Sequence, residues 1–229
     1  MTRVRSADRL RYAVETILLA VAGPAAYISS LRGLDRIGLR ASPLSWAVPD
    51  GWIGGVAPPF PWVYCAAYLV GLVAVPAGFE WAARRGERQD FGLRLPPGRR
   101  AYVSLAIAAA GLIAYQRLAY WSLGLGPPHL LEPANLAYFA GLWALVACCE
   151  EFFLRSILQR RMTRLLGPMP AIIVVAAGFA LLAHNQALVV ENLAYRFPAG
   201  VLLGWLFARH KSVLAPAACH FVANLAAFA

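Results

Sequence analysis

The chain has 229 residues, of which 60% are hydrophobic and only 14% are charged, and its formal net charge is +10. An ordinary soluble domain carries about a quarter of its residues as charged side chains, so this composition excludes a soluble globular protein. Intrinsic disorder is also excluded, because the chain is too apolar and too aromatic. The composition therefore predicts an integral membrane protein with several spans.

Apolar stretches of about 20 residues are typical of transmembrane helices, and seven such stretches follow one another along the chain. They cover residues 12–31, 60–80, 101–124, 134–158, 170–188, 190–208 and 212–229. We expect the first to be a span rather than a signal peptide, because six further apolar stretches follow it. The chain is thus predicted to be an all-α, polytopic transmembrane helical bundle of about seven to eight spans, forming a single membrane domain over residues 1–229.

The basic residues are unevenly distributed between the two sides of this predicted bundle. With the N-terminus in the cytoplasm and the spans alternating, 15 basic residues lie in inner segments and 3 in outer loops. This bias follows the positive-inside rule and indicates a cytoplasmic N-terminus. The positive charge then reflects topology and attraction to anionic lipid headgroups, and we expect no nucleic-acid partner. Loop 84–100, which contains a Pro-Pro-Gly breaker, is expected to be a solvated cytoplasmic connection.

A run of polar residues interrupts the fourth predicted span. Ionisable side chains are costly inside a membrane and usually have a partner or a task. Glu151 and Arg155 are four residues apart on one helical face, which suits an ion pair in a medium of low dielectric constant. Glu150 points about 100° away from its neighbour, so it is left free to act as an acid or a base. The alternative, that both glutamates lie in headgroup water, is disfavoured by the apolar residues that follow them.

Two later spans carry further polar groups. His184 lies in the fifth, where a lone histidine is often only a hydrogen-bonded core residue, and His220 and Asn224 share one helical face in the seventh. Together with Glu150 they supply a general base, a second proton carrier and hydrogen-bond donors for an oxyanion. The set predicts a hydrolase that cleaves an amide bond within the membrane.

The first and last of these clusters resemble motifs of the CAAX-protease and bacteriocin-processing (CPBP) family of intramembrane endopeptidases, which includes the type II CAAX prenyl endopeptidases. The EExxxR motif of that family is matched by Glu150, Glu151 and Arg155. Its HxxxN motif is matched by His220 and Asn224, which follow an Ala-Pro pair.

The second motif of the family, FxxxH, is matched only in its histidine, His184. The phenylalanine, Phe179, lies five residues before this histidine instead of four. The resemblance covers roughly residues 134–229, which we expect to be the catalytic core, whereas the preceding part matches the family only in being hydrophobic.

The resemblance implies an all-helical bundle with an active site that opens to the cytoplasm, and a glutamate-type peptidase mechanism. In that mechanism Glu150 and His184 activate the attacking water, and His220 and Asn224 stabilise the tetrahedral oxyanion. The expected partners are a membrane-associated peptide or protein substrate and the lipid bilayer. The expected location is a bacterial or archaeal plasma membrane.

By the same resemblance, Glu151 and Arg155 support the site without touching the substrate. We expect no cofactor and no metal ion, and the zinc-binding HExxH pattern is absent from the sequence. A set of one glutamate and two histidines is nevertheless capable of binding a metal. The substrate is open between a prenylated CAAX tail, a bacteriocin leader and a C-terminal sorting helix.

Two other classes of function compete with the peptidase. One is a non-proteolytic membrane scaffold or immunity protein that retains the motifs for folding. The other is a small proton-coupled transporter that uses glutamate and histidine as a relay, but the sequence lacks the inverted repeat that is typical of such transporters.

Overall fold

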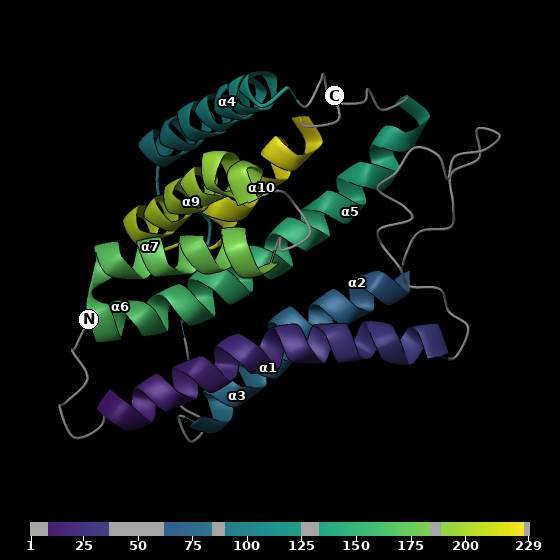
Figure 1. Ribbon diagram of the computed structural model, residues 1–229. Coiled ribbons are helices and arrows are strands. Elements are labelled where there is room, and N and C mark those ends of the chain that lie inside the picture. Colours follow the sequence, from purple (N-terminus) through teal and green to yellow (C-terminus); the bar gives the residue numbers. More distant parts are fainter. Residues whose placement is uncertain (1–8, 37–61, 84–89, 125–132, 184–188, 227–229) are drawn as a thin grey trace.

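The computed structural model describes residues 9–36, 62–83, 90–124, 133–183 and 189–226, and all the regular structure in these ranges is helical (Figure 1). The order and positions of the helical segments agree with those of the seven predicted apolar stretches. The segments are α1 (Arg9–Arg36); α2 (Trp62–Tyr68), η4 (Leu69–Ala74) and α3 (Val75–Ala83); α4 (Arg99–Ser122); α5 (Pro133–Glu151), η5 (Phe152–Gln159) and α6 (Arg160–Leu166); α7 (Pro168–Gly178) and η6 (Phe179–Ala183); α8 (Val189–Glu191), η7 (Asn192–Arg196) and α9 (Phe197–His210); and α10 (Leu214–Ala226).

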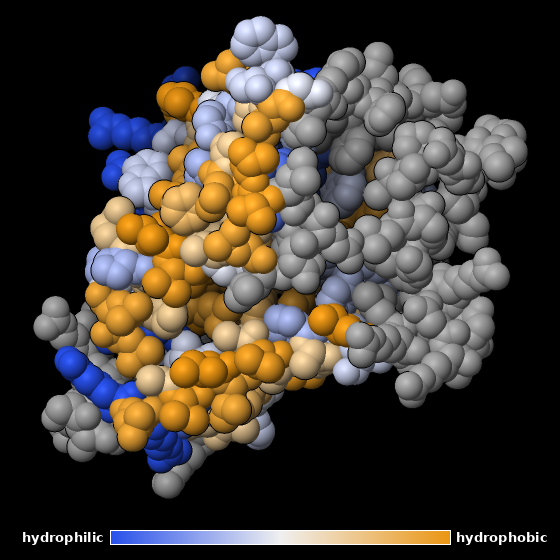
Figure 2. All heavy atoms as spheres, viewed as in Figure 1, coloured by the Kyte–Doolittle hydropathy of each residue, from blue (hydrophilic) through white to orange (hydrophobic). Residues whose placement is uncertain are grey.

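Four of these segments are long and apolar enough to cross a membrane: Arg9–Ser30, Tyr64–Ala83, Arg99–Ser122 and Ala137–Leu166. Pro168–Leu181 and Leu214–Ala226 are shorter apolar helices. Large apolar side chains such as Ile107, Trp121 and Leu193 are exposed, and Figure 2 shows apolar residues spread over much of the described face. The chain is therefore an integral membrane protein, while seven to eight spans and a cytoplasmic N-terminus stay predictions.

Four π-helical turns, η4 to η7, interrupt the α-helical segments. A π-helix joins residues five apart by hydrogen bonds, and single π-helical turns are frequent at functional sites. The turn η5 begins directly after Glu151, and η6 begins at Phe179. The apolar stretches alone did not indicate these turns, because an α-helical and a π-helical turn can be built from the same apolar residues.

Helix α10 packs against α4, α5 and α9, and α7 packs along α9. The close contact of α7 with α9 depends on two glycines spaced four residues apart, a pattern common at helix interfaces in membranes. A Cβ added at Gly200 would lie 3.2 Å from Cα of Ala176, and one added at Gly204 would lie 3.0 Å from Cγ2 of Ile172. These glycines therefore allow α9 to approach α7 and η5 closely.

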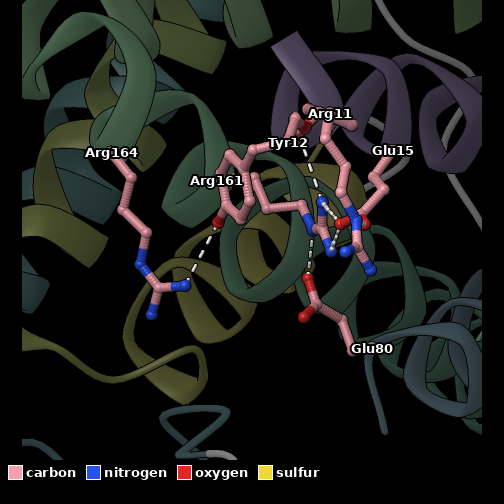
Figure 3. A network of polar contacts seen from close by, with 7 residues as sticks. Arg11, Tyr12, Glu15, Glu80, Arg161 and Arg164 are labelled. Carbon is pink, nitrogen blue, oxygen red and sulfur yellow. Dashed lines mark hydrogen bonds and ion pairs between the residues drawn. The ribbon is translucent and has the colours of Figure 1, made fainter. Parts of the chain in front are cut away.

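The N-terminal helical hairpin, formed by α1 with α2, η4 and α3, lies against η5 and α6 (Figure 1). A polar network joins it to α6 through Arg161, which is 1% exposed (Figure 3). The guanidinium group of Arg161 donates to Glu80 of α3, lies 3.5 Å from Oε2 of Glu15 and stacks 4.7 Å from the ring centroid of Tyr12. Arg164 donates to the Tyr12 hydroxyl at 3.1 Å. A buried cation thus holds three helical segments together.

The described part of loop 84–100 contacts the bundle through Phe91 and Gly92, whereas the other residues between 90 and 95 are exposed, so the solvated cytoplasmic connection stays a prediction. The carbonyl of Gly92 accepts a hydrogen bond of 2.9 Å from the amide of Val213, and the carbonyl of Phe91 accepts one from the hydroxyl of Ser156. Gly92 has a φ of 71°, and a Cβ there would lie 3.0 Å from the carbonyl oxygen of Lys211. The loop therefore connects η5 with the start of α10, the two elements that carry the candidate site.

Candidate active site

The two adjacent glutamates end helix α5, and Arg155 lies one turn later in η5. Nε of Arg155 donates to Oε2 of Glu151 at 2.7 Å, and both side chains are completely buried. This contact confirms the ion pair that was predicted from the spacing of four residues. Because a buried charge is costly when unpaired, the pair keeps both groups ionised inside the protein.

His220 of α10 lies between the two glutamates. Its Nδ1 atom is 3.0 Å from Oε1 of Glu151, and its Nε2 atom is 3.9 Å from Oε2 of Glu150. A carboxylate is only an acceptor, so Nδ1 carries the hydrogen and donates it to Glu151. The two carboxylates thus face different nitrogens of one imidazole ring, in agreement with the expectation that their positions differ.

Burial separates the two glutamates further. The side chain of Glu151 is 0% exposed, whereas that of Glu150 is 16% exposed. Water or a substrate can therefore reach Glu150 but not Glu151. Glu150 is thus the accessible carboxylate of the two, whereas Glu151 is enclosed and bonded to Nδ1 of His220.

A chain of hydrogen bonds supports the buried ion pair from α9. Nη1 of Arg155 lies 3.4 Å from Oε1 of Gln159, and Nε2 of Gln159 donates to the carbonyl of Gly204 at 2.8 Å. Gln159 was not identified from the sequence, although its spacing of four residues from Arg155 was a signal for the contact. The chain fixes the guanidinium group and, through it, Glu151.

The aromatic residue Tyr68 contacts the site from the N-terminal hairpin and was not identified from the sequence. It is 8% exposed, and its hydroxyl donates to Oε1 of Glu150 at 3.2 Å. The two residues are 82 positions apart, so no local pattern could have indicated this contact.

The remaining predicted residues are placed less completely. Asn224 is half-buried on α10, one turn after His220. His184 lies outside the described residues. Phe179, its motif partner, packs edge-to-face on the ring of His220 with the centroids 5.9 Å apart. One element of the second motif therefore reaches the site that the first and third motifs form.

Metal binding at this site depends partly on His184. Within the described ranges, no group of three or more His, Cys, Asp or Glu side chains is arranged to hold a metal ion. The alternative of a metal held by one glutamate and two histidines stays open, because it requires His184.

Comparison with known proteins identifies the segment that carries these residues. Residues 132–226 match the family model described as type II CAAX prenyl endopeptidase Rce1-like. This part of the chain is similar to an Rce1-like domain. The family resemblance predicted from the motifs is therefore confirmed, and the Rce1-like family is one of proteases. The match covers less than half of the chain and leaves helices α1 to α4 outside it. No curated protein and no solved structure matches the chain.

Proposed function

We propose that the chain is an intramembrane endopeptidase of glutamate type, with Glu150 as the base that activates water. The observation that carries this proposal is that one imidazole, His220, lies between two glutamates of different burial. Glu151 is enclosed and ion-paired, while Glu150 is accessible and faces Nε2 of the ring. The catalytic core over residues 134–229 is part of this proposal.

The attacking water binds between Glu150 and His220. Oε2 of Glu150 and Nε2 of His220 are 3.9 Å apart, which is too long for a direct hydrogen bond. The separation allows one water molecule to lie beside them at about 2.8 Å from each atom. Glu150, assisted by His184, takes a proton from this water, and the resulting hydroxide adds to the carbonyl carbon of the scissile peptide bond.

The second step stabilises and then breaks the tetrahedral intermediate. The buried carboxylate of Glu151 beside Nδ1 stabilises an imidazolium form of His220, which donates through Nε2 to the oxyanion. Asn224, on the same side of α10, supplies a second donor. The proton taken from water passes to the amide nitrogen, the C–N bond breaks, and a carboxylate and an amine leave.

The shifted second motif has a physical explanation that supports a role for His184. The motif FxxxH separates its two residues by four positions, but Phe179 and His184 are separated by five. Residues 179–183 form a π-helical turn, and such a turn links residues five apart instead of four. The sequence spacing of five residues equals the hydrogen-bond spacing of the π-helical turn that the described residues 179–183 form.

The proposed substrate is a membrane protein or membrane-associated peptide that is cut near its C-terminus or near the membrane. The apolar surface of the bundle supports delivery of such a substrate through the bilayer. A prenylated CAAX tail, a bacteriocin leader and a C-terminal sorting helix remain the three candidates.

The test compares membrane proteins, by blotting and by mass spectrometry of their C-termini, in cells that express the wild type or a Glu150→Gln variant. Glu191→Gln is the matched control, because Glu191 forms a partly exposed ion pair with Arg196 at 2.7 Å and lies outside the site. We expect an uncut substrate to accumulate with Glu150→Gln and not with Glu191→Gln.

Two results would contradict the proposal. If no protein changes its C-terminus when Glu150 is replaced, the chain does not use this residue as a peptidase base. If cells with Glu150→Gln also keep whatever growth or immunity phenotype depends on the wild-type chain, the non-proteolytic scaffold or immunity protein is the better interpretation.

A further inference from the structure

A tyrosine from outside the Rce1-like domain contacts the proposed base. Tyr68 ends α2 in the N-terminal hairpin, before residue 132, where the family match begins. Its hydroxyl donates to Oε1 of Glu150 at 3.2 Å, while Oε2 of the same carboxylate faces His220. The two oxygens of Glu150 therefore have separate environments, one supplied by the hairpin and one by the domain.

The position of Tyr68 is determined by its neighbours. Its ring packs 4.7 Å from that of Tyr27 and 4.8 Å from that of Tyr64, measured between centroids. Helix α1 can approach η4 closely because a Cβ on Gly71 would lie 2.6 Å from Cβ of Tyr27. The tyrosine hydroxyl is thus held by close packing between α1 and the α2–η4 segment.

A fixed donor on one carboxylate oxygen has a chemical consequence for a base. Without it, the Glu150 side chain is free to rotate, and either oxygen can turn toward His220. With Tyr68 bound to Oε1, Oε2 stays directed at the space beside Nε2 of His220, where the water is placed. Such pre-organisation lowers the activation barrier without changing substrate affinity.

We propose that Tyr68 is a positioning residue for Glu150, so that the N-terminal hairpin completes the active site of the Rce1-like domain. This inference rests on the proposed function in taking Glu150 as the base. It adds that residues 132–226 alone do not form a fully active site, although they contain Glu150, His184, His220 and Asn224.

The kinetic test uses the full chain in liposomes and a fluorogenic peptide that ends in a farnesylated CAAX sequence. Tyr68→Phe keeps the ring and removes only the hydroxyl, and Tyr195→Phe is the matched control from the second core cluster, where Tyr195 packs on Tyr120. We expect kcat to fall by about 10- to 100-fold in Tyr68→Phe with KM unchanged, the size typical of a lost hydrogen bond to a charged group. Tyr195→Phe should behave as wild type.

A second measurement does not need turnover. The infrared carboxylate band of Glu150 is obtained as the difference between the wild type and Glu150→Gln, and the same difference is recorded in the Tyr68→Phe background. We expect the band to shift when the hydroxyl is absent, with an unchanged far-ultraviolet circular dichroism spectrum for Tyr68→Phe.

The outcomes separate the two proposals. An unshifted band, or wild-type kcat in Tyr68→Phe, overturns the positioning role of Tyr68. A raised KM with unchanged kcat overturns it as well, because the hydroxyl would then act in substrate binding. A Glu150→Gln variant that cleaves the peptide at the wild-type rate overturns the proposed function, whatever the band does.

Discussion

Replacing Glu151 by glutamine removes the charge of the most deeply buried carboxylate at the site while keeping its shape. In the wild type this carboxylate accepts from Nε of Arg155 at 2.7 Å and from Nδ1 of His220 at 3.0 Å, and it is 0% exposed. The substitution leaves the cation of Arg155 buried without a counter-ion. The folded state should therefore lose stability, and His220 should lose the group that orients it.

The expected size follows from this burial. Removing one partner of a buried ion pair costs about 3–5 kcal/mol, and each kcal/mol lowers Tm by roughly 2–4 °C in a chain of 150–250 residues. We therefore expect Tm to fall by about 10 °C. Activity should fall by at least about 100-fold, because a carboxylate behind a catalytic imidazole controls its tautomer and orientation.

A double variant separates stability from chemistry. In Glu151→Gln/Arg155→Met neither charge remains, so no buried ion is left without a counter-ion, which is the costly state of a broken pair. Thermal unfolding in detergent should show most of the lost stability recovered, while peptide cleavage should stay absent. Glu191→Gln is the control, since a partly exposed pair contributes about 0–1 kcal/mol.

Two results would refute this reasoning. A Tm of Glu151→Gln within about 2 °C of the wild type, by the conversion used above, would show that the pair does not hold the site together. Recovery of cleavage in the double variant would show that His220 does not need the Glu151 carboxylate.

Three further predictions concern packing and the oxyanion. Gly204→Ala should destabilise the protein by about 1–3 kcal/mol in the same unfolding assay, because the new Cβ would lie 2.9 Å from Oε1 of Gln159. Gly78→Ala is the control and should leave stability unchanged, because no atom lies within 4 Å of its Cβ. Arg161→Leu should lower stability by about 3–5 kcal/mol, because it removes the buried ion pair that Arg161 forms with Glu80; wild-type unfolding would contradict this. Asn224→Ala should reduce kcat by about 10²–10³-fold with unchanged Tm, and unchanged kcat would remove it from the oxyanion site.

The helical segments could be predicted from the sequence because apolar runs of this length favour helices in a bilayer, whatever their neighbours are. The ion pair of Glu151 and Arg155 could be predicted for the same reason, since a helix alone brings residues four apart together. The π-helical turns and the packed loop around Gly92 could not. They depend on contacts with other segments, such as the hydrogen bond from Val213.

The sequence by itself determined the class of protein, the order of the helices and the candidate catalytic residues. These features depend on composition and on the spacing of residues within one helix. Only the tertiary structure decided which groups from other helices complete the surroundings of the two glutamates. Glu151 is enclosed between Arg155 and His220, and Glu150 stays accessible under the hydroxyl of Tyr68. These contacts join residues that are 69 and 82 positions apart in the sequence. They arise from the packing of different helices, which the spacing of residues within one helix does not indicate.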